Sequence, residues 1–228
     1  MFDNVVEETD YIKDCSKYQL AVKLGLFGIL LSLIATIAWE VFWFIYYEMG
    51  DIHIVSIAQA AVILNPIAFT GSLFTSVGFV GVFAMKRSRL GIIFPLLIFT
   101  SEFSWNLLFY LTYEFHFFPS ELLSSVNNFI TLIFAIIGCL VLFTIRRVSV
   151  NPSFLTIFAF YYVAQRGFLI LANYVIVRLF IGVLTYFTYL LPNFILNLIG
   201  TVLVIHFFSI ESRMGCIEAL DSQTDLVV

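Results

Sequence analysis

The sequence predicts an all-α fold, a polytopic membrane bundle of six transmembrane helices. Two observations lead to this prediction. Apolar residues make up 61% of the 228-residue chain and charged residues only 11%, whereas soluble domains are nearer half apolar and a quarter charged. Six apolar stretches also reach the length of about 20 residues that a helix needs to cross the hydrocarbon layer. This composition excludes a soluble enzyme, a nucleic-acid-binding protein and a disulfide-stapled secreted domain.

The predicted spans are separated by polar interruptions at 48–51, 86–89, 114–121 and 146–152. The fifth interruption carries only Arg178, but residues 154–209 are too long for one span and suit two with a tight turn. The domain organisation is then an N-terminal tail at 1–23, a transmembrane domain at 24–209 and a C-terminal tail at 210–228. The six spans are 24–47, 55–85, 91–113, 124–145, 154–177 and 183–209.

The distribution of basic residues predicts the orientation. Nine of the eleven Lys and Arg residues would lie on one side of the six spans, and Arg166 and Arg178 are the exceptions. Loops rich in Lys and Arg face the cytosol. Both termini are therefore predicted to be cytosolic, in an integral membrane protein whose particular membrane the sequence does not identify.

The predicted tails carry two further expectations. Residues 10–22 have Tyr11, Cys15, Tyr18 and Val22 at helical spacing, which fits a short interfacial helix as well as a frayed polar tail. Cys15 and Cys216 would both face the cytosol and Cys139 would lie inside a span. No disulfide is expected from this arrangement.

A weak internal repeat is visible in the spans. AWEVFWFIYYE at 38–48 resembles SWNLLFYLTYE at 104–114, and AQRGFLILANY at 164–174 is a fainter third copy. Three repeated helical hairpins would account for these matches, with a pseudo-axis along the membrane normal. The alternative is that apolar helices ending in an aromatic belt resemble one another by composition alone.

Charged residues within the spans are candidates for function, because a charge near the bilayer centre costs about 3 kcal/mol or more. Three such residues occur: Glu40, Glu102 and Arg166. By helix rise, Glu102 lies about 18 Å along the third span and Arg166 about 20 Å along the fifth, counted from the same side. We therefore predict that Arg166 faces the bundle interior and pairs with Glu102. Glu40 lies about 24 Å along the first span, nearer the exterior.

Amide side chains accompany these charges. Asn106 lies one turn beyond Glu102, and Asn193 and Asn197 share a face of the sixth span. A path for a solute or an ion is one interpretation; a network that fixes helix packing is the other. Close packing is also the ordinary explanation for the small residues between Gly71 and Gly81. The candidate polar core consists of Glu40, Glu102, Asn106, Arg166, Asn193 and Asn197.

The functional hypothesis is a small-solute or ion permease, or a subunit of one. The predicted loops are too short for a separate catalytic domain, which favours transport or assembly over catalysis. Two alternatives stay open: a structural or assembly subunit of a membrane complex, and a membrane-embedded lipid-modifying enzyme that would use Glu40 or Glu102.

The expected partners are the lipid bilayer, a small solute or ion and other membrane subunits, without nucleic acid. No catalytic residue, metal or cofactor is expected, because no span contains Asp or Lys and only His206 among the histidines lies in one.

Overall fold

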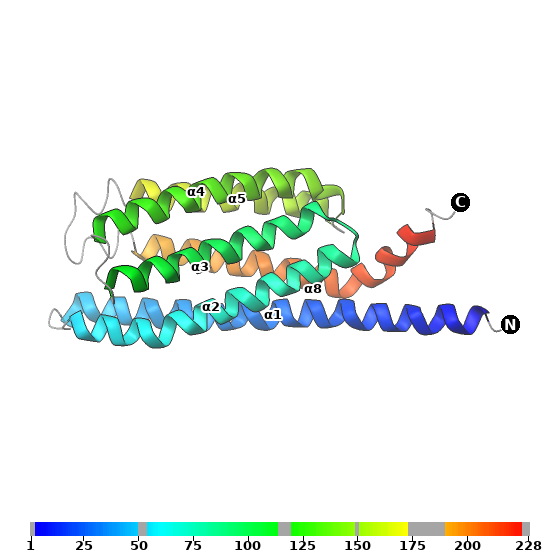
Figure 1. The fold of residues 1–228 in the computed structure, drawn as a ribbon, viewed down its shortest axis with the longest axis horizontal. Helices are drawn as coiled ribbons and strands as arrows, with labels where there is room; N and C mark the ends of the chain where they lie inside the picture. The colour runs from blue at the N-terminus through cyan, green and yellow to red at the C-terminus, as the bar shows by residue number, and fades with distance from the viewer. Residues whose placement is uncertain (1–2, 50–53, 114–119, 149–150, 173–189, 225–228) are drawn as a thin grey trace.

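The protein is a bundle of long helices that lie side by side along one axis (Figure 1). The computed structural model describes residues 3–49, 54–113, 120–148, 151–172 and 190–224. Of these residues 97% are helical, and no strand occurs among them, which confirms the all-α prediction. In chain order the elements are α1 (Asp3–Met49), α2 (Ile54–Met85), the 3-10 turn η1 (Leu90–Ile92), α3 (Ile93–Tyr113), α4 (Ser120–Ile145), the 3-10 turn η2 (Arg146–Val148), α5 (Pro152–Leu171) and α8 (Leu191–Thr224).

The start of α1 and the end of α8 lie at the same end of the bundle, which we call the terminal end (Figure 1). The turns after α2 and α4 lie at this end too. Most of the described basic side chains therefore gather there, as the sequence predicted. They are Lys17, Lys23, Lys86, Arg87, Arg89, Arg146, Arg147 and Arg213.

Four of the described helices are long and apolar enough to cross a membrane. The qualifying segments are Cys15–Ile45, Gln59–Met85, Leu90–Leu108 and Leu191–Arg213, and a shorter apolar segment runs from Phe129 to Ile145. They correspond to the predicted first, second, third and sixth spans and, for the shorter one, the fourth. The full count of six spans and the threefold repeat stay predictions.

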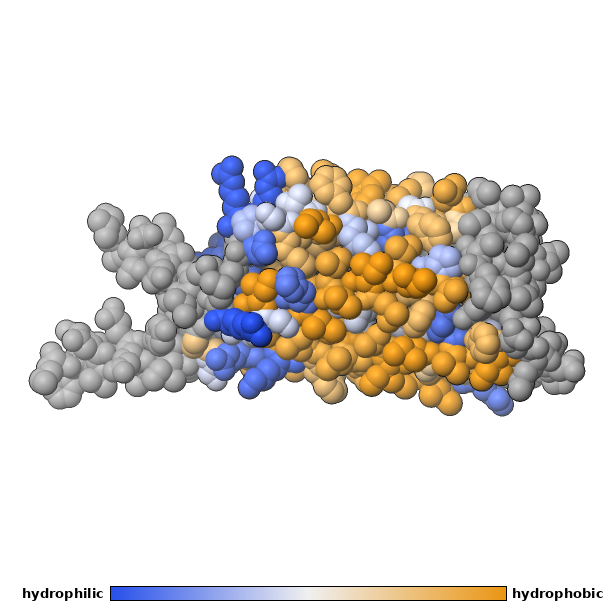
Figure 2. All heavy atoms as spheres, turned by 180° about the vertical axis from the view of Figure 1, so that it is seen from behind, coloured by the Kyte–Doolittle hydropathy of each residue, from blue (hydrophilic) through white to orange (hydrophobic). Residues whose placement is uncertain are grey.

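The outer surface has the character of a lipid-facing surface. Figure 2 shows apolar residues over the middle of the bundle, with hydrophilic residues gathered toward the terminal end. Large apolar side chains on several helices are about 60% exposed, which would be costly in water but is favourable against lipid tails. Examples are Ile34, Ile63, Phe129, Leu140 and Val202.

Helix α1 extends well beyond its predicted span. Its 47 residues correspond to about 70 Å at the rise of an α-helix, roughly twice the hydrocarbon thickness. Residues 3–23 belong to this continuous helix and form neither a separate interfacial helix nor a frayed tail. Tyr18 and Val22 are each only 1% exposed, because this segment packs against other helices. Helix α8 likewise continues past residue 209.

Local sequence signals set the turns at the terminal end. After α2, the backbone N–H of Ser88 donates to the carbonyl of Phe83 and that of Arg87 to the carbonyl of Ala84. This is a Schellman cap with Arg87 in the left-handed region, at φ 54°. At the start of α5, the Asn151 side chain accepts a hydrogen bond from the N–H of Phe154 at 3.1 Å, and Pro152 is the first helical residue.

Glycines allow α1 and α2 to approach backbone to backbone. A Cβ atom added at Gly78 would lie 2.4 Å from the Cα of Gly25, and one added at Gly28 would lie 2.3 Å from the backbone nitrogen of Thr75. A Cβ at Gly71 would lie 2.8 Å from the carbonyl oxygen of Gly28. These are distances that real Cβ atoms do not tolerate. The small-residue stripe of α2 is therefore a helix-packing surface, as the ordinary explanation holds.

Candidate functional site

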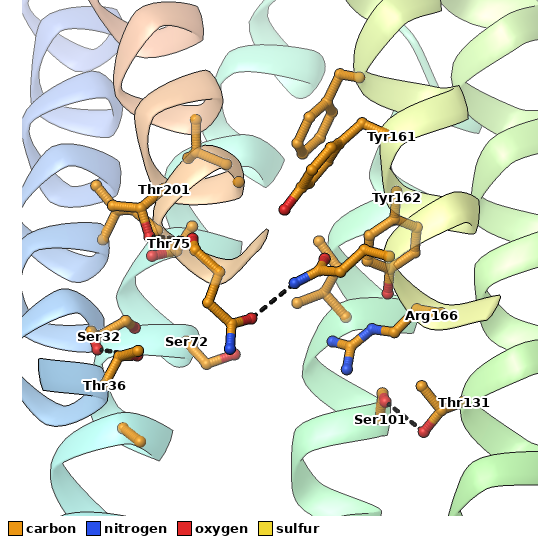
Figure 3. Close-up of a pocket in the computed structure, with 18 of the residues that line it drawn as sticks. Ser32, Thr36, Ser72, Thr75, Ser101, Thr131, Tyr161, Tyr162, Arg166 and Thr201 are labelled. Carbon is orange, nitrogen blue, oxygen red and sulfur yellow. Dashed lines mark hydrogen bonds between the residues drawn. The ribbon is translucent and has the colours of Figure 1, made fainter. Parts of the chain in front are cut away.

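A polar cavity lies inside the bundle, and we call it the central cavity (Figure 3). Its volume is about 500 Å³, within the range of about 300–1,000 Å³ that small-molecule sites occupy. All six long helices contribute to its wall. The polar lining residues are Ser32 and Thr36 of α1, Ser72 and Thr75 of α2, Ser101 of α3, Asn127 and Thr131 of α4, Tyr161, Tyr162, Gln165 and Arg166 of α5, and Asn193, Asn197 and Thr201 of α8.

The cavity lies at mid-height of the apolar helices. Ser72 is the central residue of the apolar segment Gln59–Met85, so it is about 20 Å from either end by helix rise. Ser32 of α1 is likewise close to the centre of Cys15–Ile45. Polar side chains at this depth must find partners inside the protein or in the contents of the cavity, because lipid offers none.

Amide side chains connect α5 to α8 on one wall of the cavity. Gln165 donates from its Nε2 to the Oδ1 of Asn197 at 2.6 Å, and Asn197 donates to Asn193 at 3.4 Å. The hydroxyl of Tyr161 donates to the backbone carbonyl of Leu196. Asn193 and Asn197 therefore share a face, as their spacing indicated, and their partner on α5 is Gln165.

Threonine hydroxyls in the wall mostly donate to their own helices. Thr36, Thr75 and Thr201 each donate to the carbonyl four residues earlier. This bond satisfies the hydroxyl hydrogen and leaves the oxygen able to accept. Between α3 and α4, the hydroxyls of Ser101 and Thr131 are 3.5 Å apart (Figure 3).

Arg166 brings a positive charge into the central cavity. Its side chain is half-buried, and the guanidinium points into the cavity in Figure 3. The guanidinium carbon lies 5.6 Å from the centre of the Tyr162 ring, which is within cation–π range. The Nε atom is buried and has no hydrogen-bond partner among the described residues.

Glu40 and Asn106, two further members of the predicted polar core, are not among the described residues that line the cavity. Glu40 of α1 is half-buried, one turn beyond the lining residue Thr36. Asn106 of α3 is also half-buried. The side chain of Glu102 lies outside the described part of the structure, so its pairing with Arg166 stays a prediction.

Tightly packed aromatic rings close the central cavity toward the terminal end. The ring of Phe79 lies 4.8 Å from Phe208 and 5.0 Å from Phe207, and 5.6 Å from Phe94. Phe94 in turn contacts Phe158 at 5.9 Å between centroids. We call this the phenylalanine layer, and its members are at most 5% exposed: Phe79, Phe83, Phe94, Phe158, Phe207 and Phe208.

A buried group of charged and polar side chains lies beyond this layer, at the terminal end. Glu211 of α8 is 1% exposed, and its Oε2 is 2.7 Å from the Nζ of Lys86, whose side chain is 5% exposed. The hydroxyl of Tyr18 donates to the same oxygen at 2.5 Å. This terminal cluster, Tyr18, Lys86 and Glu211, joins α1, the end of α2 and α8.

The sequence does not predict this cluster, because Glu211 follows the sixth apolar stretch and falls in the predicted C-terminal tail. Tyr18 is one of several residues at helical spacing in the predicted N-terminal tail, and nothing in the sequence singles it out. Their contact spans 193 residues of sequence, and no local pattern marks it.

Cysteine pairing also differs from the prediction. Cys15 of α1 is disulfide-bonded, whereas no disulfide was expected. Cys139 of α4 is a free thiol. The side chain of Cys216 lies outside the described residues. The prediction depends on a cytosolic location for both tails, where disulfides are rare.

No group of three or more His, Cys, Asp or Glu side chains within the described ranges is arranged to hold a metal ion. The chemistry available in the central cavity is hydrogen bonding by hydroxyls and amides, together with the charge of Arg166. No protein-family model, curated protein or solved structure matches the chain.

Proposed function

We propose that this protein is a six-span membrane permease that carries a small solute through the central cavity. The observation that carries the proposal is a polar cavity of about 500 Å³ at mid-height of an apolar bundle, built by residues of all six long helices. A bundle held together only by packing gains nothing from such a space, because unfilled volume costs stability. Ser72 and Asn127 support the same function, since each has a buried oxygen without a hydrogen-bond partner among the described residues.

The phenylalanine layer and the terminal cluster give the permease a closed state. Both lie between the central cavity and the terminal end, so a solute in the cavity is shut off from that end. Passage requires the helices that carry these residues, chiefly α2 and α8, to separate from one another. This is alternating exposure of a fixed site at mid-membrane.

The cavity favours transport over the two alternatives. An assembly subunit would have a dry core in which polar groups are paired with one another. A lipid-modifying enzyme would place Glu40 or Glu102 in a cleft with a second polar group, and Glu40 is not among the described lining residues. The transport experiment below also tests these alternatives, because neither an assembly subunit nor an enzyme would carry a solute into liposomes.

Blocking the central cavity should stop transport. We expect Ser72→Trp, which fills the cavity from the middle of α2, to reduce uptake into liposomes to background for whichever solute the wild type carries. The measurement uses purified protein and a panel of labelled amino acids, sugars, organic acids and inorganic ions. Val77→Trp is the matched control, because Val77 is on the same helix but 43% exposed on its outer surface.

Ser72→Leu, which adds a smaller side chain at the same position, is a second variant that narrows the cavity. The comparison is valid only if both Ser72 variants remain monodisperse and as heat-stable as Val77→Trp. Uptake by Ser72→Trp at the wild-type rate would rule out this cavity as the route. Absence of uptake for the whole panel by well-folded wild-type protein would instead favour assembly or catalysis.

The proposed orientation places the terminal end in the cytosol. The eight described basic residues at that end support it. The disulfide at Cys15 opposes it, since disulfides are rare on cytosolic surfaces. The basic residues carry more weight, because they occur in four separate segments (α1, the turns after α2 and α4, and α8), whereas the disulfide is a single feature.

Cysteine labelling decides the orientation. In a variant whose native cysteines are all replaced by alanine, Ser120→Cys at the start of α4 should react with a membrane-impermeant maleimide on intact cells. Ser153→Cys, near the start of α5 at the terminal end, should react only after permeabilisation. The reverse pattern would invert the topology, and labelling of both positions from outside would contradict the six-span arrangement.

A further inference from the structure

We propose that the solute carried in the central cavity is a small oxyanion, a carboxylate or a phosphate, and that Arg166 binds its charge. This inference rests on the proposed permease function and adds the chemical class of the substrate.

The first support is the charge of the cavity wall. Among the described lining residues, Arg166 is the only one with a formal charge; the others are hydroxyl, amide and apolar side chains. A cation in this space would be repelled by the guanidinium with no carboxylate in the described wall to offset it. An anion would gain attraction, which is strengthened by the low dielectric of the bundle interior.

The second support is the unused hydrogen-bonding capacity of Arg166. Its Nε is buried without a partner among the described residues, and a guanidinium left in that state at mid-membrane is costly. The planar fork of Nε and one terminal nitrogen matches the two oxygens of a carboxylate or phosphate. A bound oxyanion would therefore supply the partner that this side chain lacks.

The third support is the set of neutral groups around the guanidinium. Ser101 of α3 and Thr131 of α4 line the same cavity as Arg166, and their hydroxyls are 3.5 Å apart (Figure 3). The amide of Asn127 also lines the cavity, and its Oδ1 has no partner among the described residues. Hydroxyl and amide groups can donate to the remaining oxygens of an anion without adding charge. One cation with neutral donors makes a site from which a solute can also be released.

Glu102 is the competing partner for Arg166, as the sequence predicted. It follows Ser101 on α3, but its side chain lies outside the described residues. If the two pair, Glu102→Gln should destabilise the protein, and the double variant with Arg166→Gln should recover part of the loss. If Arg166 serves an oxyanion, Glu102→Gln should instead leave stability near that of the wild type.

The test measures oxyanion binding to the purified protein directly, so it does not depend on transport. Acetate, benzoate and inorganic phosphate are titrated by calorimetry at constant ionic strength, with benzamide as the neutral counterpart of benzoate. We expect at least one oxyanion to bind, and Arg166→Gln to weaken that binding by about tenfold or more. Arg166→Lys should restore it only in part, since lysine keeps the charge without the fork. The control is Arg146→Gln, because the Arg146 side chain packs over Phe143 away from the cavity.

The three oxyanions separate the two substrate chemistries: preference for acetate or benzoate indicates a carboxylate, and preference for phosphate indicates a phosphate group. Binding of benzamide as tight as that of every oxyanion, or oxyanion binding unchanged by Arg166→Gln, would overturn the inference. Oxyanion binding that needs Arg166 but is accompanied by no flux would support the site and count against the permease. Flux of a neutral solute that Ser72→Trp stops and Arg166→Gln leaves unchanged would support the permease and overturn the oxyanion site.

Discussion

Replacing Glu211 with glutamine is expected to lower the free energy of unfolding by about 3–5 kcal/mol, the typical cost of removing one partner of a buried ion pair. The glutamine side chain has nearly the same shape, so the loss is electrostatic. The side chain of Lys86 is 5% exposed, and its ammonium group would lose the carboxylate 2.7 Å away. The Tyr18 hydroxyl would also lose its charged acceptor.

This loss can be measured by unfolding the purified protein in a denaturing-detergent titration followed by tryptophan fluorescence. Arg213→Gln is the matched control, because Arg213 is a charged residue two positions further along α8 with an exposed side chain; its effect should stay within about 0.5 kcal/mol. The double variant Lys86→Met with Glu211→Gln should recover much of the stability, since no charge is then stranded. A Glu211→Gln variant as stable as Arg213→Gln would show that the pair contributes no net stability.

The same substitution bears on the proposed closed state. The terminal cluster joins α1, α2 and α8 at the end of the bundle where the phenylalanine layer closes the central cavity. A weaker cluster makes separation of these helices easier. If the permease proposal holds, the Glu211→Gln variant at a temperature where it is folded should therefore spend more time open toward the terminal end.

The parts of the fold that the sequence predicted well are those governed by local signals. Apolar length predicted the helices around the first, second, third and sixth spans. The Asn151–Pro152 pair predicted an interruption, and it acts as the cap and first residue of α5. The spacing of Asn193 and Asn197 predicted a shared polar face, and both line the central cavity.

The parts that the sequence did not predict depend on contacts between distant segments. Tyr18 and Glu211 are 193 residues apart, and each lies where its helix extends beyond the predicted span, so no local pattern indicates that the two meet. Arg166 could be predicted to face the interior, because a charge exposed to lipid is costly. The serine and threonine hydroxyls that line the same cavity could not be predicted. A single Ser or Thr, such as Ser101 or Thr131, fits a lipid-facing position and a cavity wall equally well, because its hydroxyl can donate to its own helix.

Replacing Gly78 with alanine is the second substitution for which we expect a large effect. The added Cβ would lie 2.4 Å from the Cα and 2.6 Å from the nitrogen of Gly25, and 2.9 Å from the carbonyl oxygen of Ala21. All three are backbone atoms of α1, so no side chain can rotate away and the two helices must move apart. Overpacking of this kind costs about 1–3 kcal/mol, and occasionally more.

Gly167→Ala is the control for the Gly78 prediction, because a Cβ added at Gly167 in α5 meets nothing within 4 Å. There the exchange should be neutral or stabilising by up to about 1 kcal/mol, as alanine favours the helix. The comparison, made by the same detergent titration, separates packing from helix propensity. Ser32 and Thr75 of the cavity wall lie at the neighbouring glycines Gly71 and Gly28 of the same α1–α2 interface, so separation of α1 and α2 should also weaken solute binding in Gly78→Ala. Equal stability of the two variants would contradict the close backbone contact between α1 and α2.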